Sequence, residues 1–464
     1  MRGRRAEFPT IAEAARLIAA KQLSPVEFTR ALLQRIAALD PQINSFLTVT
    51  EKHALAAART AERAVIAGRK GPLLGIPVGY KDIFETAGVP TTAHSRLLAD
   101  NVPAEDAEPV RRLTAAGAVM LGKLATHEFA VGGPALDLPW PPARNPWDPR
   151  RFTGGSSSGS GAAVAAGLVL GALGSDTGGS IRLPAAYCGI AGLKPTPGLV
   201  SRRGVIPLAP SLDTVGPMAW TAEDCALLLD AMAGHDPADP ASVPGPGGSY
   251  AAALAQGVKG LRVGVLRRFY ERDVPAEPEV LGAMAGAERV FRDLGCTVGE
   301  ATLPPVQDYN AVGRVIICAE AYALHEARLH ARLADYSRAF RVRVLGGALI
   351  RAADYIAAQR RRSALIAETA ALFGKFDVLI SAPTAGAAPM MSEQRPDDGF
   401  ARPMLTTVAN VAAVPSLVVC GGFTKTGLPV GLEIIGPAWG DATVLRAGYH
   451  FEREAGLRDT RPTF

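Results

Sequence analysis

Two segments rich in glycine and serine are the part of this sequence best suited to chemistry. Residues 154–160 read Gly-Gly-Ser-Ser-Ser-Gly-Ser, and residues 176–184 read Asp-Thr-Gly-Gly-Ser-Ile-Arg-Leu-Pro. Such composition also occurs in ordinary turns and linkers. Here a compact apolar run separates the segments, so we interpret both as loops held by buried structure. A serine in such a loop can attack a carbonyl carbon if a neighbouring group accepts its proton.

The common templates for serine- and glycine-rich loops fit poorly. A phosphate-binding loop requires a lysine directly after its last glycine, and neither segment has one. Residues 155–159 formally match G-x-S-x-G, but that motif needs a buried strand just before it, and residues 148–151 predict no such strand. No S-x-x-K motif surrounds Ser156 or Ser180. Another group must therefore activate a serine.

A lysine upstream could be that group. Lys81 lies in the segment Gly-Ile-Pro-Val-Gly-Tyr-Lys-Asp at residues 75–82. Lysine accepts a proton only when it is neutral, so its pKa must fall from about 10.4 to roughly 7–8. Burial among apolar neighbours such as Ile76 and Val78 would lower the pKa in this way. The alternative is an ordinary surface lysine paired with Asp82.

These three segments, in this order, resemble the amidase-signature family. The similarity includes the separation of Ser156 and Ser180 by 24 residues. It extends to further segments and covers roughly residues 10–455; the additional matches are residues 122–129, 145–147, 192–196 and 427–432. Several motifs at family-like spacing make a stronger signal than any single glycine-rich loop.

The resemblance implies a role for each matching residue. Ser180 would be the nucleophile, Ser156 a bridging serine that follows a cis peptide bond from Gly155, and Lys81 the base. The oxyanion hole would be formed by backbone N–H groups of the loop, namely those of Thr177, Gly178, Gly179 and Ser180. Two successive glycines suit this task because no Cβ blocks the approach of several N–H groups to one oxygen.

Neighbouring polar residues are expected to support this site. We interpret Ser157 as a residue that hydrogen-bonds the loop, and Asp176 and Arg182 as supports of the catalytic loop. Three other polar residues are interpreted as packing or surface groups, namely Lys123, His127 and Glu128.

The substrate pocket is expected to be formed by loops, because loops commonly carry specificity on a rigid scaffold. One candidate is the stretch 129–133, with Phe129, Ala130 and Val131 as the predicted substrate-binding residues. The other is the loop 389–403, which contains two consecutive methionines.

The resemblance implies a hydrolase that cleaves linear amides, not peptide bonds, through an acyl-enzyme. Water would release a carboxylic acid together with ammonia or an amine. Esters and carbamates (urethanes) pass through similar tetrahedral intermediates, so the same site could cleave them. The expected partner is therefore a small-molecule amide, ester or carbamate, and no cofactor is expected.

Two other functions stay open. The first is the glutamine-hydrolysing A subunit of a tRNA-dependent amidotransferase complex, which residues 201–204 and 211–213 resemble. Residues 207–210 differ from the sequence usual in that subunit. Arg362 could be either a ligand of the glutamine carboxylate or a packing arginine. The second is a non-catalytic binding protein of the same fold, against which the presence of all three predicted catalytic residues argues.

The elements that would position these residues alternate along the chain. Residues 1–70 are predicted to be helical, with capping boxes starting at Thr10 and Ser24. Farther on, short β-like runs alternate with helical patterns, which favours an α/β fold. A late hairpin is predicted over residues 416–420 and 431–435. The resemblance adds the arrangement expected of an amidase-signature fold, one large mixed β-sheet covered by helices on both faces.

The chain is predicted to form a single domain over residues 1–464. Its catalytic core would span residues 75–220. The Pro/Gly-rich segment at residues 237–248 is the best linker candidate, and we expect it to cross the surface of this domain.

Composition limits the remaining partners. The net charge is +5, from 49 Lys+Arg and 44 Asp+Glu in 464 residues, which is too weak a field to suggest nucleic-acid binding. The five cysteines lack a CxxC pair and the histidines lack an HExxH pattern, so free thiols and no metal site are expected. The N-terminus does not resemble a signal peptide, and no apolar stretch is suited to span a membrane. We expect a cytoplasmic monomer or homodimer.

Overall fold

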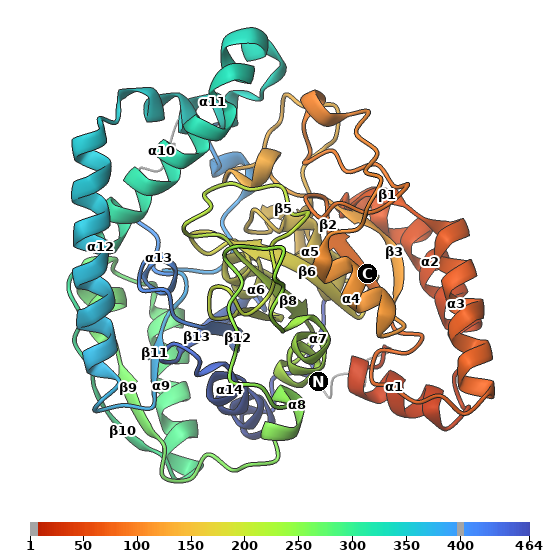
Figure 1. Ribbon diagram of the computed structural model, residues 1–464. Helices are drawn as coiled ribbons and strands as arrows, with labels where there is room; N and C mark the ends of the chain where they lie inside the picture. The colour runs from red at the N-terminus through yellow and green to blue at the C-terminus, as the bar shows by residue number, and fades with distance from the viewer. Residues whose placement is uncertain (1–7, 397–402) are drawn as a thin grey trace.

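The computed structural model describes residues 8–396 and 403–464, which form one mixed sheet of 11 strands surrounded by helices (Figure 1). In spatial order the strands are β1 (Phe46–Val49), β3 (Val119–Leu124), β2 (Pro77–Lys81), β6 (Gly171–Asp176), β8 (Thr214–Ala219), β7 (Ala191–Lys194), β12 (Ser416–Phe423), β13 (Pro429–Ile435), β11 (Val378–Ser381), β9 (Arg262–Val265) and β10 (Thr297–Glu300). The predicted α/β class with one large mixed sheet is confirmed.

Both pairing modes occur in this sheet. β2 runs parallel to β3 and β6, and β9 runs parallel to β10 and β11. The other neighbours are antiparallel. They include the hairpin of β12 and β13, in which Ser416 lies opposite Ile435, so the hairpin predicted from the sequence is confirmed.

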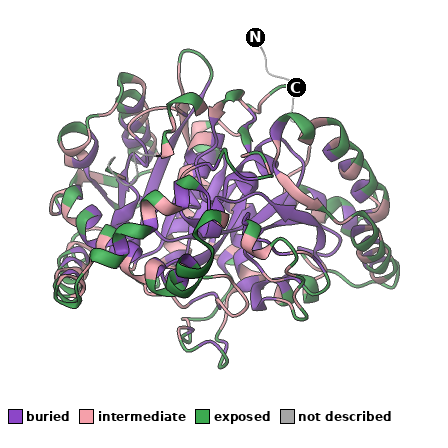
Figure 2. Ribbon diagram, turned by 90° about the horizontal axis from the view of Figure 1, so that it is seen from above, coloured by how far each residue is buried: buried purple, intermediate pink, exposed green. Residues whose placement is uncertain are grey.

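The longer helices flank the sheet, and their outer sides are the exposed part of the molecule (Figure 2). The helices are α1 (Ile11–Ala19), α2 (Pro25–Ile43), α3 (Glu51–Ile66), α4 (Glu108–Ala115), α5 (Ser158–Ala165), α6 (Arg182–Cys188), α7 (Ala222–Met232), α8 (Tyr250–Ala253), α9 (Pro278–Asp293), α10 (Val306–Arg332), α11 (Arg338–Val344), α12 (Ala352–Leu372), α13 (Thr407–Val411) and α14 (Asp441–Ala455).

Two glycines of β6 show that helices cover both faces. A Cβ on Gly171 would meet Leu228 of α7 and Ile11 of α1. A Cβ on Gly174 would instead meet Ile181, just before α6, and Met218 of β8. Successive residues of a strand point to opposite faces, so residues 171 and 174 face opposite sides of the sheet.

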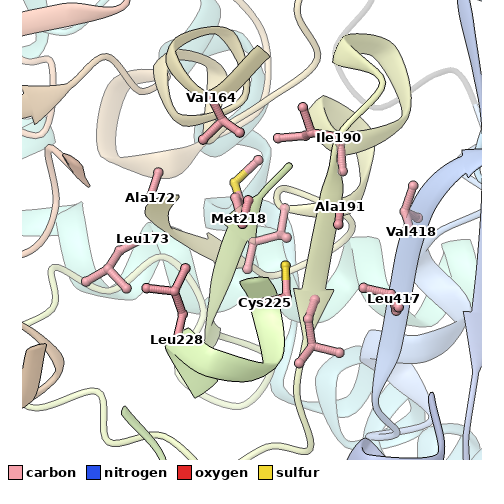
Figure 3. Packing of buried hydrophobic residues seen from close by; sticks show 14 of the residues in the cluster. Val164, Ala172, Leu173, Ile190, Ala191, Met218, Cys225, Leu228, Leu417 and Val418 are labelled. Carbon is pink, nitrogen blue, oxygen red and sulfur yellow. The ribbon is translucent and has the colours of Figure 1, made fainter. Parts of the chain in front are cut away.

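The central strands are buried along their whole length. Every residue of β2, β3, β6 and β8 is buried, which is typical of strands covered on both faces. Figure 3 shows Val164 of α5, Ala172 of β6, Met218 of β8 and Ala191 of β7 in this core. The strands that carry the candidate site therefore lie in the buried core of the molecule.

The N-terminal region differs from the helical prediction in one place. α1, α2 and α3 are present, and Thr10 begins α1 with a complete capping box. Ser24 accepts a hydrogen bond from the Glu27 N–H but donates its own proton to Glu62, so only half of that box forms. The prediction of helix throughout residues 1–70 is wrong at β1, which pairs with β3 at the edge of the sheet.

Two segments lie outside the large sheet and its helices. Residues 148–151, predicted not to form a buried strand, lie in β5 (Asp148–Phe152), which pairs with β4 (Arg144–Asn145) in a separate ribbon. None of these four residues is buried, so the buried strand that a G-x-S-x-G elbow requires is not formed. Residues 237–248 contain neither helix nor strand, and the Asp239 carboxylate accepts the Arg202 N–H at 2.7 Å. Their role as a surface linker of a single domain stays a prediction.

Candidate active site

Lys81 ends β2 inside the protein. Its side chain is fully buried, and its Nζ lies 2.7 Å from Oγ of Ser156 and 2.8 Å from Oγ of Ser175. Ser175 belongs to β6, the strand beside β2, so the sheet itself brings the lysine and this serine together. The alternative of a surface lysine paired with Asp82 is wrong, because Asp82 instead pairs with the buried Lys123 at 3.2 Å.

Burial controls the charge of Lys81. Removal from water lowers the pKa of its amine to about 7, against the opposing attraction of Asp213 and Asp176. A lysine with this pKa is substantially neutral near pH 7 and can accept a proton from a hydroxyl 2.7 Å away.

Ser156 is buried in the loop before α5. The peptide bond between Gly155 and Ser156 is cis, as the resemblance implied. Ser157 holds this loop against β6, since its hydroxyl donates to the Ser175 carbonyl at 3.2 Å and accepts the Ser175 N–H at 3.3 Å. The Ser157 N–H also donates to the carbonyl of Ser180 at 3.2 Å. The two glycine- and serine-rich segments are therefore in direct contact.

Ser180 lies in the tight loop between β6 and α6 and lines a cavity. The N–H groups of Thr177, Gly178 and Ser180 donate no hydrogen bond within residues 8–396 and 403–464. Gly179 differs, because its N–H donates to Oδ1 of Asp176 at 2.8 Å. Its φ of +136° and the nearby Thr406 hydroxyl leave no room for a Cβ. Of the four N–H groups expected in an oxyanion hole, three are thus available to a ligand.

Asp176 and Arg182 form a fully buried ion pair behind this loop. Arg182 Nε lies 3.0 Å from Asp176 Oδ2, and Nη2 lies 2.9 Å from Oδ1. The same guanidinium donates to Glu433 of β13 at 2.6 Å and to partners beside and within α13, namely the Thr406 carbonyl and the Asn410 side chain. Burial by itself would raise the pKa of Asp176, but Arg182 lowers it to about 2. Neither residue lines the cavity.

The cavity in front of Ser180 has a volume of about 180 Å³. Thr177, Gly178 and Gly155 lie in its wall beside Ser180. Most of the remaining wall is apolar and comes from distant parts of the chain; it includes Ala130, Pro134, Phe152, Leu183, Leu208, Ile317, Pro396 and Met404. A small cavity with a largely apolar wall beside Ser180 suits an uncharged carbonyl group.

A comparison with known protein families and structures shows which family the chain belongs to. The family model described as Amidase matches residues 27–445. This chain belongs to the amidase-signature family. A curated relative, the A subunit of glutamyl-tRNA(Gln) amidotransferase from Geobacter sp. (strain M21), is 40% identical over 471 residues, with 96% of this chain and 97% of the relative covered.

Two solved structures extend the comparison. An inhibitor-bound vestigial protein complex, described as revealing the origins of an s-triazine catabolic enzyme, contains a chain of TM-score 0.90 and 34% identity. That match covers 98% of this amidase-family chain and 100% of the other. A peptide amidase in complex with the competitive inhibitor chymostatin has a TM-score of 0.83 and 34% identity, with 99% of each chain covered.

The predicted substrate-binding residues of this amidase-family protein separate into two groups. Ala130 lines the cavity, but Phe129 and Val131 do not. Phe129 packs into an aromatic cluster, with its ring centroid 4.4 Å from that of His325 and 5.8 Å from that of Phe340. In the loop 389–403, residues 394–396 line the cavity, whereas Met390 and Met391 do not, and residues 397–402 lie outside the described residues.

The structure places three further residues relative to the site. Ser175 contacts Lys81, and its position directly before Asp176 in the second motif was the available signal. His127, interpreted as a packing or surface group, is buried and lines the cavity. Arg362 was left open between a carboxylate ligand and a packing arginine. It donates to the carbonyls of Ser211 and Val411 and does not line the cavity, which favours the packing role.

Membrane spans and metal clusters are both absent from residues 8–396 and 403–464. This part of the chain contains no helix long and apolar enough to cross a membrane. It also contains no group of three or more His, Cys, Asp or Glu side chains that could hold a metal ion.

The buried ion pair generates a stability prediction. Arg182→Met should lower the free energy of unfolding by about 3–5 kcal/mol, because Asp176 and Glu433 would keep buried carboxylates without their cation. Urea denaturation followed by circular dichroism measures this change. Arg150→Met is the matched control, since the Arg150 side chain is 76% exposed and its loss should leave the free energy of unfolding nearly unchanged. Equal effects of the two substitutions would contradict a central role for Arg182.

The lowered pKa of Lys81 predicts a pH dependence of stability. Between the folded pKa of about 7 and the ordinary 10.5, the unfolded lysine binds a proton and the folded lysine does not. The free energy of unfolding should therefore fall as pH drops through this window, by about 1.4 kcal/mol per pH unit for this group, and level off below it. Lys194 has the same lowered pKa of about 7 and contributes a similar slope. Lys81→Met should thus remove about half of the combined slope in denaturation at several pH values, and an unchanged slope would refute the buried neutral lysine.

Proposed function

We propose that this amidase-signature protein hydrolyses amide C–N bonds through Ser180, with Ser156 as the bridge and Lys81 as the base. The observation that carries this proposal is the position of Lys81 Nζ, fully buried and 2.7 Å from the Ser156 hydroxyl. The contact between the Ser156 and Ser180 loops supports a proton path from nucleophile to base.

The reaction would proceed in two halves. Neutral Lys81 accepts the proton of Ser156 as Ser156 accepts the proton of Ser180, and the Ser180 oxygen bonds to the amide carbon. The negative charge that develops on the carbonyl oxygen is stabilised by free loop N–H groups. Return of the proton to the nitrogen breaks the C–N bond and releases ammonia or an amine. Water then attacks the acyl-Ser180 ester by the same path and releases the carboxylic acid.

The comparisons bear on which amide is the substrate. Named relatives that are 39–41% identical over nearly the whole chain are A subunits of glutamyl-tRNA(Gln) amidotransferase. Their names favour a glutamine-hydrolysing subunit over the stand-alone amidase that the sequence led us to expect. The peptide amidase among the structural neighbours supports the stand-alone alternative. The expectation that esters or carbamates are also cleaved rests only on the tetrahedral intermediate, which is similar for these substrates and for amides.

The experiment that separates these alternatives compares two preparations. Ammonia release from glutamine is measured with the purified chain alone and with the candidate partner subunits added, beside a panel of simple primary amides and anilides. Glutamine hydrolysis that requires the partners supports the amidotransferase function. Rapid hydrolysis of simple amides by the chain alone supports the stand-alone enzyme.

The role of Ser180 predicts a nearly inactive variant. Ser180→Ala should reduce kcat by about 10³-fold or more while the protein stays folded, because Thr177, the other hydroxyl residue described in the cavity wall, donates its hydroxyl to Asp213 at 2.6 Å. Ser160→Ala is the matched control and should keep most of the activity, since Ser160 lies in α5 and donates to the Leu173 carbonyl. Substantial activity in a folded Ser180→Ala protein would refute the assignment.

The role of Lys81 predicts the pH profile of activity. Since only the neutral amine accepts a proton, kcat/KM should rise with pH through about 7, the folded pKa of Lys81. Lys81→Ala should flatten this rise and lower the rate by several orders of magnitude. If Lys81→Ala keeps the wild-type profile, another group is the base even if Ser180 is the nucleophile.

A further inference from the structure

A cavity that the proposed reaction does not use has a volume of about 280 Å³, compared with about 180 Å³ for the cavity in front of Ser180. We call it the α10 cavity, because its wall combines residues of α10 with residues of the loops that follow β2, β3 and β7. Of its described lining residues, five are apolar and four are polar, the latter being Glu85, Asn101, His325 and Arg328. A wall of this mixture suits a small ligand that has both a charged and an apolar part.

The α10 cavity is distinct from the cavity of Ser180. No residue described in one wall occurs in the other, although Phe129 lines the α10 cavity and its neighbour Ala130 lines the Ser180 cavity. Both residues have a left-handed backbone, with φ of +47° and +60°, and their N–H groups donate to the carbonyls of Ala93 and His127 at 3.0 and 2.9 Å. Residues other than glycine adopt this conformation only where the surrounding structure enforces it. The partition between the two cavities is therefore fixed.

Glu85 and Arg328 bring opposite charges to the α10 cavity. Glu85 lies in the segment after β2, whereas Arg328 lies on α10. In the part of the chain that is described, neither side chain forms an ion pair or a hydrogen bond, with the other or with a third residue. Burial, followed by the charge of Arg328, lowers the pKa of His325 to about 4, so this ring is neutral and adds no charge. The described wall thus offers one unpaired anion and one unpaired cation.

Two uncharged polar side chains of the wall are held in fixed orientations. Nδ1 of His325 lies 2.9 Å from the Tyr336 hydroxyl, and its ring centroid lies 4.4 Å from that of Phe129. The side-chain amide of Asn101 donates to the Thr91 carbonyl at 2.9 Å. Among the described residues, Nε2 of His325 and Oδ1 of Asn101 have no hydrogen-bond partner. Both atoms can therefore bond a ligand in the α10 cavity.

We propose that the α10 cavity binds a free α-amino acid with an aliphatic side chain. Arg328 pairs with the carboxylate of this ligand, while Glu85 and Oδ1 of Asn101 pair with its ammonium group. The apolar part of the wall, which includes Ile206 and Leu324, contacts the aliphatic side chain. A ligand with a single charge would leave Glu85 or Arg328 without a partner, so the wall favours a zwitterion. Such a ligand contains no amide bond, and the proposal does not depend on the reaction proposed for Ser180.

Isothermal titration calorimetry with leucine and two analogues tests the site. 4-Methylpentanoate is leucine without its ammonium group, and 3-methylbutylamine is leucine without its carboxylate. The wild-type protein should bind leucine at least about 10-fold more tightly than either analogue, because a hydrogen bond to a charged group contributes this factor. Equal affinities for the three compounds, or no saturable binding of leucine, would overturn the proposal.

Variants then assign each charged group of leucine to a residue. Glu85→Gln and Arg328→Gln should each weaken leucine binding by about 10-fold or more. Glu85→Gln should not change the affinity for 4-methylpentanoate, and Arg328→Gln should not change that for 3-methylbutylamine. Glu326→Gln and Arg332→Gln are the matched controls, because both residues are exposed on α10 and do not line the cavity. Wild-type affinity for leucine in Glu85→Gln and Arg328→Gln would overturn the proposal.

A variant in the other cavity shows which cavity leucine occupies. Ile317 also lies on α10, but it lines the cavity of Ser180. Folded Ile317→Ala protein should therefore bind leucine with the wild-type affinity. A loss of leucine binding as large as that in Arg328→Gln would place leucine in the Ser180 cavity and overturn the proposal, whether or not the protein hydrolyses amides.

Discussion

The guanidinium of Arg182 is removed from water but keeps its charge, so the protein must satisfy its five N–H groups. It does so with five hydrogen bonds, to Asp176, Glu433, the Thr406 carbonyl and Asn410. These partners come from β6, from β13 and from the region of α13, while Arg182 itself begins α6. β6 and β13 are separated by three strands in the sheet, so one cation connects its two halves directly behind the loop that carries Ser180.

This connection shapes the loop as well as stabilising it. The Asp176 carboxylate, kept ionised by Arg182, accepts the N–H groups of Gly179 and Ile181. The turn that results leaves the N–H groups of Thr177, Gly178 and Ser180 without partners in the described structure. Polar groups that folding leaves unsatisfied are costly unless water or a ligand satisfies them. The contacts that fix the backbone of the loop are thus the ones that leave unpaired the three N–H groups to which we assign the developing negative charge in the proposed reaction.

A shifted pKa alone does not identify a base in this protein. Burial lowers the pKa of both Lys81 and Lys194 to about 7. Lys194 donates to the carbonyl of Pro195, the next residue, and lines no part of the cavity. Lys81 instead lies between the hydroxyls of Ser156 and Ser175. What distinguishes the two lysines is the group each can exchange a proton with, which depends on where β2 places the side chain.

The α/β class and the late hairpin followed from the sequence itself through local periodicity, and the family followed from short motifs. The pairing of Lys81 with the Ser156 loop was implied by the resemblance of those motifs to the family. The sequence could not predict β1, whose strand forms only by pairing with β3. It also misjudged the cavity, since Phe129 turns into an aromatic cluster from α10 and α11 while His127 faces the cavity. Arg343 is more than 200 residues from His127 in the chain, and they share one wall only after folding. Motifs specify the reacting groups locally, whereas the pocket is built from long-range contacts, which only the tertiary structure decides.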